Sequence, residues 1–112
     1  MLIYLRNKDM KDLSIGMLNE LYGNLLTNRQ SEMIKAYFDF DLSLGEIAAS
    51  EGISRQAVSD SIKKGEKLLL FYEDSLKFYD KSLKIKELIS ELESSELTGE
   101  EKIIIEKIKE LL

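Results

Sequence analysis

Cysteine and histidine are both absent from this chain of 112 residues. Disulfide bonds, thiol nucleophiles, zinc sites built on these side chains and histidine acid–base catalysis are therefore excluded. Proline, the residue that most disrupts a helix interior, is absent too. Hydrophobic residues make up 44% of the chain and charged residues 33%, a balance typical of soluble globular proteins. These features predict an all-α fold in a single helical domain over residues 1–112.

Long apolar runs and catalytic signatures are missing as well. No run approaches the roughly 20 apolar residues that a membrane-spanning helix needs, and the N-terminus lacks the apolar segment of a signal peptide. We therefore expect a cytoplasmic protein without a membrane span. The sequence contains no phosphate-binding loop, glycine-rich dinucleotide fingerprint or H-E-x-x-H zinc motif. We expect no enzyme activity, no cofactor and no bound metal.

Positive charge is also scarce, since 16 lysine and arginine residues face 21 aspartate and glutamate residues, for a net charge of −5. Domains that bind nucleic acid are usually basic. Residues 55–67 differ from the whole, with four cationic and two acidic side chains, whereas residues 80–112 hold six cationic and nine acidic ones. Because one copy can neutralise few phosphates, we expect it to bind nucleic acid weakly and with strong salt dependence.

The segment over residues 43–67 has the pattern of two helices joined by a tight turn. Ser43 and Glu46 form a capping-box signature, which predicts that the first of these helices begins at Leu44. Gly52 tolerates the positive φ with which helices commonly end. We interpret the segment as a helix-turn-helix, and a plain helical hairpin is the alternative.

The second helix of this motif is expected to begin near Arg55, with Ser54 as its cap. Val58 and Ile62 lie four residues apart and are expected to pack it on the first helix. On its outward side, arginine and glutamine can pair with guanine and adenine in a major groove, while lysines contact phosphates. The predicted nucleic-acid-binding residues are Ser54, Arg55, Gln56, Ser59, Asp60, Lys63, Lys64 and Lys67.

Two helices are expected before this motif, so that residues 12–80 form a helix-turn-helix core. Residues 1–11 show no clear period, and the first helix is predicted over about 13–25 with Asp12 as its N-cap. The apolar residues that recur along it at helical spacing are Leu13, Met17, Leu18, Leu21, Tyr22 and Leu25. We expect this set to supply its packing face.

A second capping-box signature, Thr27 with Gln30, predicts that the next helix begins near Asn28. Its apolar stripe consists of Met33, Ile34, Tyr37 and Phe38. Aromatic side chains in this region can stack on bases, but their helical spacing favours the core. We therefore assign the four aromatic residues of the region to the core: Tyr22, Tyr37, Phe38 and Phe40.

Asp39 and Asp41 stand in the loop before the helix-turn-helix. Two aspartates at this spacing resemble part of a calcium-binding loop, but the third acidic ligand and the closing glutamate are missing. We interpret the pair as solvated loop residues, with capping as a further role, and expect no metal there.

After the motif, apolar periodicity continues without a strong helix breaker. Gly65 is the one weak point, since glycine inside a helix costs about 1 kcal/mol relative to alanine. We expect the recognition helix to continue to about Phe78. The C-terminal extension, residues 81–112, is predicted to form two more helices, over about 81–94 and 99–112.

This extension is more apolar than a single small bundle requires. It can pack on the helices of its own chain, or it can pack on a second copy of the chain. A homodimer presents two reading helices and doubles the cationic surface, which suits a chain with little positive charge. We expect a homodimer, and packing within one chain is the alternative.

The run LTNRQSEMIKAYFDFDLSLGEIAASEGISRQAVSDSIKKGEKLL resembles the helix-turn-helix of sigma-factor region 4. More narrowly, residues 21–27 (LYGNLLT), 43–48 (SLGEIA) and 54–58 (SRQAV) resemble the YlxM-like family. Members of that family are small bacterial helix-turn-helix proteins whose genes lie beside those of the signal recognition particle. The resemblance covers about residues 18–80.

The resemblance implies a DNA-binding protein with a role in the signal recognition particle pathway. It places the start and the exposed side of the recognition helix at Ser54, Arg55, Gln56, Asp60, Lys63 and Lys64. Two residues depart from the family pattern. Glu51 replaces an apolar residue, which implies that the first helix of the motif is held less tightly, and Ser59 replaces a bulkier aromatic residue, which removes one contact.

Three functions remain open at this point. The first is a regulator that docks the helix over 55–67 in the major groove of duplex DNA. The second is an accessory of the signal recognition particle that binds the particle's RNA or its GTPase. The third is a protein-interaction module that binds no nucleic acid and uses its acidic C-terminal third as the contact surface. The acidic total charge favours the third and the gene neighbourhood of the family favours the second. We favour the first, because Arg55 and Gln56 together suit base reading in a major groove.

Overall fold

A computed structural model describes residues 13–112, so the expected lead-in over 1–11 and the Asp12 cap lie outside the described residues. Within the described part, the regular elements are α-helices and one short 3₁₀ helix, and no strand is present. The all-α fold class is confirmed. The chain divides into two compact units, one ending at Leu76 and one beginning at Lys77. Their grouping into one domain stays a prediction.

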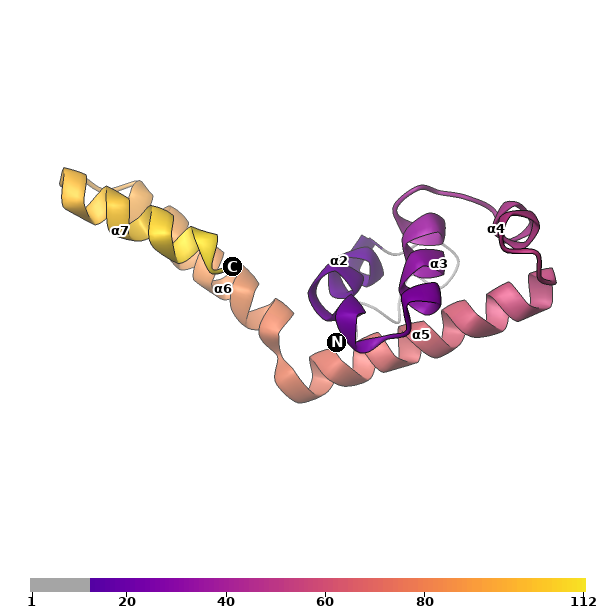
Figure 1. The fold of residues 1–112 in the computed structure, drawn as a ribbon. Helices are drawn as coiled ribbons and strands as arrows, with labels where there is room; N and C mark the ends of the chain where they lie inside the picture. The colour runs from indigo at the N-terminus through magenta and orange to yellow at the C-terminus, as the bar shows by residue number, and fades with distance from the viewer. Residues whose placement is uncertain (1–12) are drawn as a thin grey trace. The chain divides into compact units, whose positions relative to one another are not determined.

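The first unit contains α2 (Leu13–Tyr22), η1 (Gly23–Leu25), α3 (Asn28–Phe38), α4 (Leu44–Glu51) and α5 (Arg55–Leu76). The three shorter helices lie along one side of α5, with α4 at its N-terminal end and α2 nearer its C-terminal end (Figure 1). Thr27 and Ser43 cap α3 and α4 through complete capping boxes. Both predicted helix starts are therefore confirmed.

One face of α5 supplies the centre of this unit. Val58, Ile62 and Leu69 are buried on it, and Gly65 is buried among them. Their spacing of three and four residues keeps them on one side of the helix. Since α2, α3 and α4 all contact α5, this single face holds the first unit together.

At Gly65, α3 packs closely against α5. A methyl group at this position would overlap Cδ1 of Ile34 and would lie 3.4 Å from Cδ2 of Leu26. Ile34 is fully buried, so its end cannot swing aside into solvent. The glycine that the sequence marks as a weak point in a helix is thus the residue that lets the two helices meet.

The packing face of α2 differs from the expected one. Leu18 and Tyr22 are buried as predicted, together with Ile15 and Asn19. The other predicted members in the described part are exposed: Met17, Leu21 and Leu25. The predicted stripe was wrong there, because it joined two adjacent faces of one helix and passed over a polar residue that faces inward.

Asn19 is buried because α3 satisfies its side chain. Its amide donates a hydrogen bond to the carbonyl oxygen of Ser31 at 3.0 Å. The Ser31 hydroxyl in turn donates to Oδ1 of Asn19 at 3.0 Å. A buried polar group is stable when it is hydrogen-bonded in this way, and the pair fixes α2 against α3.

A second polar contact ties α2 to α5. The Tyr22 hydroxyl donates a hydrogen bond of 2.7 Å to Oε1 of Glu73, whose side chain is only 1% exposed. Phe38 is buried and Tyr37 is half-buried, so the core assignment is confirmed for Tyr22 and Phe38. It was wrong for Phe40, which is 65% exposed and lies beneath Nζ of Lys35, 5.9 Å from the ring centre.

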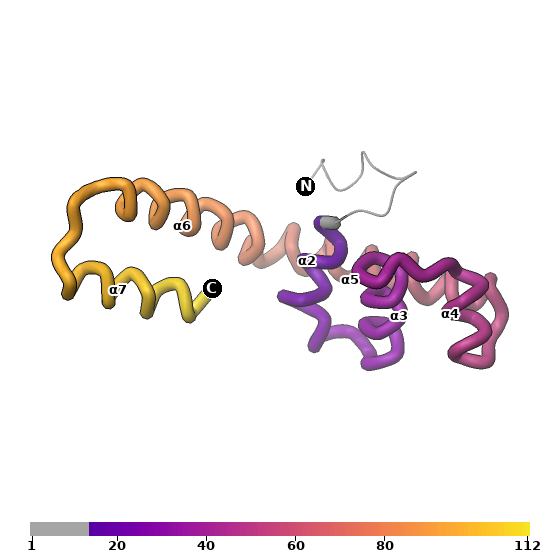
Figure 2. Tube along the Cα trace, turned by 90° about the horizontal axis from the view of Figure 1, so that it is seen from above, coloured from indigo at the N-terminus to yellow at the C-terminus, as the bar shows by residue number. Residues whose placement is uncertain are grey.

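The second unit is a hairpin of α6 (Phe78–Glu93) and α7 (Gly99–Glu110), which run antiparallel (Figure 2). Lys77 has a φ of 60°, which ends α5 at Leu76, two residues before the expected end. The residues buried in the hairpin are Ile89 and Ile105.

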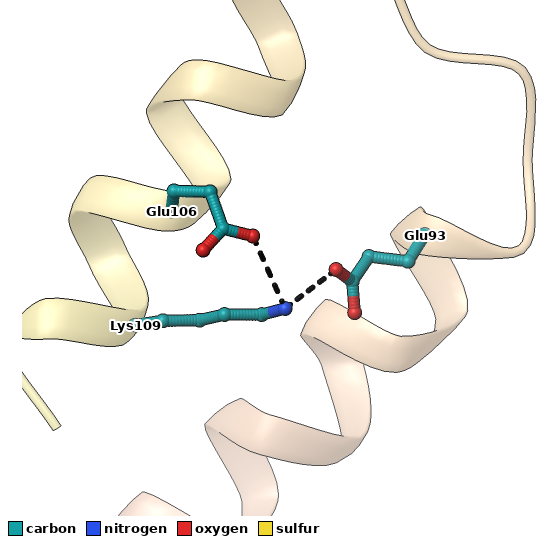
Figure 3. A network of polar contacts seen from close by, with 3 residues as sticks. All are labelled: Glu93, Glu106 and Lys109. Atoms are coloured by element: carbon teal, nitrogen blue, oxygen red, sulfur yellow. Dashed lines mark hydrogen bonds and ion pairs between the residues drawn. The ribbon is translucent and has the colours of Figure 1, made fainter.

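Polar contacts also join the two helices of the hairpin. Lys109 of α7 donates a hydrogen bond to Glu93 of α6 at 2.6 Å and contacts Glu106 at 3.4 Å (Figure 3). The bond to Glu93 raises the pKa of Lys109 above its usual value. In residues 13–112, no helix has both the length and the apolar character needed to cross a membrane.

We expect Gly65→Ala to destabilise the protein. Alanine favours a helix by about 1 kcal/mol, but forcing a methyl group into a filled core costs about 1–3 kcal/mol. The net effect is a loss of about 1 kcal/mol, measured by urea denaturation followed by circular dichroism. Gly45→Ala is the control, since its methyl group would meet nothing closer than 3.8 Å. Equal stability of Gly65→Ala and the parent would contradict the close contact of α3 with α5.

Candidate nucleic-acid interface

The turn between α4 and α5 is closed by a left-handed glycine. Gly52 has φ 69° and ψ 33°, and its N–H donates to the carbonyl oxygen of Ala48. The N–H of Ile53 reaches the same oxygen at 3.2 Å. Glycine adopts this conformation at no steric cost, so the chain can reverse within two residues and start α5 at Arg55. The predicted helix-turn-helix is confirmed.

The C-terminal end of α4 is held by α3. Arg29 of α3 donates to the carbonyl oxygen of Glu51 at 3.4 Å, and its Nε lies 3.8 Å from the Glu51 carboxylate. A cation is favourable at a helix C-terminus, where carbonyl groups are left unpaired. The expectation that Glu51 loosens this helix did not take Arg29 into account. Its ion pair with Glu51 adds a contact between α3 and the end of α4.

Four of the predicted contact residues form an outward row on α5. Gln56, Asp60, Lys63 and Lys67 are all exposed. They are spaced by four, three and four residues, which places them on one side of the helix, away from the buried face. We call these four residues the α5 row.

The first two members of the α5 row are bonded to each other. Nε2 of Gln56 donates a hydrogen bond of 2.9 Å to Oδ1 of Asp60. This bond limits the freedom of the Gln56 side-chain amide. Asp60 also adds a negative charge close to the lysines of the row, so it weakens their attraction for phosphate.

The other four predicted residues occupy different positions. Ser54 is exposed, but its hydroxyl oxygen accepts a hydrogen bond from the N–H of Ala57 at 3.0 Å, which makes it the N-cap of α5. Ser59 is half-buried, and Lys64 is exposed on the flank of the row. These three residues thus contribute a cap, a packing contact and a cation beside the row.

Arg55 lies toward α4 instead of along the α5 row. A Cβ atom built on Gly45 would be 3.8 Å from Nε of Arg55 and 3.9 Å from its Cδ. The guanidinium group is therefore carried over the first turn of α4, and its side chain remains exposed. The spacing of residues in α5 placed Arg55 near this edge, but only the fold shows that a glycine of α4 lies under it.

The acidic residues provide no metal site in the part of the chain that the structure describes. No three acidic side chains come together there in a group that can hold an ion.

Asp41 has a φ of 56°, and aspartate adopts the left-handed region more readily than most residues. Its position in the loop before α4 thus has a local conformational reason.

The sequence matches the profile of the UPF0122 family, described as "Putative helix-turn-helix protein, YlxM / p13 like", over residues 9–111. The chain belongs to this family. The match includes both the helix-turn-helix and the C-terminal hairpin. It confirms the resemblance to the YlxM-like proteins and extends it well beyond residues 18–80.

UPF0122 proteins of several bacteria are similar to this chain. The one from Fusobacterium nucleatum is 45% identical over 93 residues, which cover 82% of this chain and 90% of the relative. The one from Desulforamulus reducens is 43% identical over 88% of this chain and 86% of the relative. A Geobacillus protein is 40% identical over 90% and 94%. These three relatives align with the chain over 86–94% of their own length.

We expect Ser54→Ala to lower the free energy of unfolding by about 1 kcal/mol, because it removes the hydroxyl that caps α5. Thermal unfolding followed by circular dichroism measures the loss. Ser54→Asp is the matched control, since aspartate caps a helix about as well as serine. If Ser54→Ala were as stable as Ser54→Asp, Ser54 would have no capping role.

Proposed function

We propose that this UPF0122 protein is a DNA-binding regulator that places the N-terminal half of α5 in the major groove. The observation that carries this proposal is the α5 row, an exposed polar and cationic strip on the second helix of a helix-turn-helix. In such motifs the N-terminal residues of the second helix contact base edges. A regulator of this kind acts in the cytoplasm, and the helix-turn-helix family gives no reason to assign an enzyme activity.

The proposed contacts follow the positions of the side chains. Gln56, at the start of the α5 row, is the proposed base reader, and Lys63 and Lys67 are placed to meet phosphates. Arg55 extends over α4 and is proposed to contact the backbone or a base at that edge. Lys64 adds a phosphate contact from the flank. Ser54 and Ser59 act by shaping α5 more than by touching DNA.

A single copy offers too few cations for tight binding. Four cationic side chains lie in residues 55–67, accompanied by Asp60 and Glu66. Each phosphate contact strengthens binding at low salt, so few contacts give a weak complex. We propose that the protein binds DNA as a homodimer, which presents two copies of α5.

The second candidate is binding to the RNA of the signal recognition particle. It rests on the resemblance to YlxM-like proteins, and the same lysines can meet an RNA backbone by shape. The GTPase of the signal recognition particle, or another protein, is a further alternative as the bound partner. Duplex DNA is preferred because a helix fits a B-form major groove, whereas the major groove of an RNA helix is too narrow to admit side chains.

We expect Arg55→Ala combined with Lys63→Ala to weaken binding to duplex DNA severalfold without changing the fold, because both side chains are exposed. Fluorescence anisotropy measures the affinity at low and near-physiological salt, with DNA from the protein's own gene neighbourhood. The control is Lys35→Ala with Lys102→Ala, which changes the net charge equally but lies outside α5.

The same titration separates the candidate functions. Tight binding of DNA that survives salt, while signal recognition particle RNA and unrelated duplexes are released, supports the regulator. Preferred binding of the RNA would support the particle accessory instead. Equal affinities of the double variant and the parent would remove the α5 row and Arg55 from the interface.

Asp60→Asn is expected to strengthen binding to DNA of any sequence. Asparagine keeps the oxygen that accepts the hydrogen bond from Gln56 and removes the negative charge beside Lys63 and Lys67. The gain should be largest at low salt, since screening weakens electrostatic interactions, and anisotropy titrations at several salt concentrations measure it. A loss of affinity would instead show that the Asp60 carboxylate itself contacts the target.

A further inference from the structure

The hairpin of α6 and α7 presents apolar side chains that its own packing leaves uncovered. Leu88 is 59% exposed and Ile104 is 55% exposed, and further exposed apolar residues continue the two stripes. The spacing of three or four residues within each stripe keeps it on one side of its helix. We call these six residues the open face: Ile85, Leu88, Leu92, Ile104, Ile108 and Leu111.

The two stripes of the open face lie on the same side of the hairpin. Leu88 comes one residue before the buried Ile89, and Ile104 comes one residue before the buried Ile105. One residue is a rotation of about 100° around a helix. Because α6 and α7 run antiparallel (Figure 2), the same rotation from the shared seam brings both stripes to one surface.

The hairpin has a small core of its own. Ile89 and Ile105 are its buried apolar residues, and the seam between the helices is closed in part by the exposed ion pair of Lys109 with Glu93. Two helices alone bury too little apolar surface to be stable. A layer laid on the open face supplies the missing burial.

The charges around this face are divided along the length of the hairpin. Residues 91–106, which surround the turn and form its tip, contain six glutamates and one lysine. Residues 77–90 contain four lysines, one aspartate and one glutamate, and residues 107–112 contain two lysines and one glutamate. The hairpin thus has an acidic tip and a basic base, although the net charge of the C-terminal third is negative.

We propose that the open face binds the open face of a second copy in an antiparallel arrangement, so that the tip of each hairpin lies against the base of the other. A twofold axis then joins the same surface of both chains, as in most homodimers. The four helices form a bundle around the combined apolar stripes. Each acidic tip meets a basic base, so attraction acts at both ends.

The charge division is what selects a second copy as the occupant. A parallel pairing sets tip against tip and brings twelve glutamates together, six from each chain, which like-charge repulsion opposes. In the antiparallel pairing, the charges of the two facing surfaces are complementary. The inference supports the homodimer of the proposed function, but it does not depend on DNA, because the association is measured with protein alone.

We expect sedimentation velocity to show the 12.9 kDa chain as a dimer at micromolar concentration. Leu88→Gln with Ile104→Gln should raise the dissociation constant about tenfold or more, since four apolar side chains leave the interface. Leu83→Gln with Ile103→Gln is the control. Those two residues are similarly exposed but fall outside both stripes, so this variant should remain a dimer.

Cross-linking tests the antiparallel arrangement, because the chain has no cysteine of its own. Ser95→Cys labels the tip and Lys81→Cys labels the base. A mixture of the two variants should form disulfide-linked dimers much faster than either variant alone. Rapid linking of Ser95→Cys to itself would indicate a parallel pair and overturn the arrangement.

A parent chain that stays monomeric at about 100 micromolar, far above the concentrations typical of specific dimers, would overturn the proposal and leave the open face to a different protein. A dimer that the control variant disrupts and the Leu88→Gln, Ile104→Gln variant preserves would also overturn it. Circular dichroism of every variant establishes that it is folded. A correct dimer that fails to bind DNA would refute the proposed function while leaving this inference intact.

Discussion

The close approach of α3 to α5 at Gly65 is the constraint on which the first unit depends. Because Gly65 has no side chain, Ile34 of α3 packs directly against the backbone of α5. Val58, Ile62 and Leu69 can then all face inward. The buried face of α5 is thereby fixed, and the direction of its opposite face follows. The α5 row is outward because Gly65 lies inward, so one small residue in the core orients the surface proposed to read DNA.

Buried polar contacts then specify how α2 lies in this core. Apolar contacts tolerate sliding and rotation, whereas a buried polar group must meet its partner or lose its hydrogen bond. Asn19 meets Ser31 of α3, and Tyr22 meets Glu73 of α5. These two contacts favour the observed rotation of α2, which leaves Met17, Leu21 and Leu25 exposed.

Features set by neighbouring residues were predictable from the sequence, and those set by distant contacts were not. The starts of α3, α4 and α5, the Gly52 turn and the exposed Gln56 all depend on a few adjacent positions. The inward Asn19, the role of Gly65 and the position of Arg55 over Gly45 depend on other helices. The end of α5 was not predictable either, because lysine is not a residue type that favours the left-handed conformation found at Lys77.

The scarcity of positive charge and the exposed apolar surface of the hairpin both support the proposed association of two copies. A helix-turn-helix with two lysines and one aspartate in its α5 row gains little attraction from one copy, and a hairpin with two buried isoleucines gains little stability from itself. The proposed dimer meets both deficits, because the second copy brings a second α5 and covers the open face. Six of the 21 acidic residues gather at the hairpin tip, where the basic surface of the proposed partner copy would neutralise them. Net charge is therefore a poor guide to this protein, since the sign of each surface is set by where the fold gathers its charges.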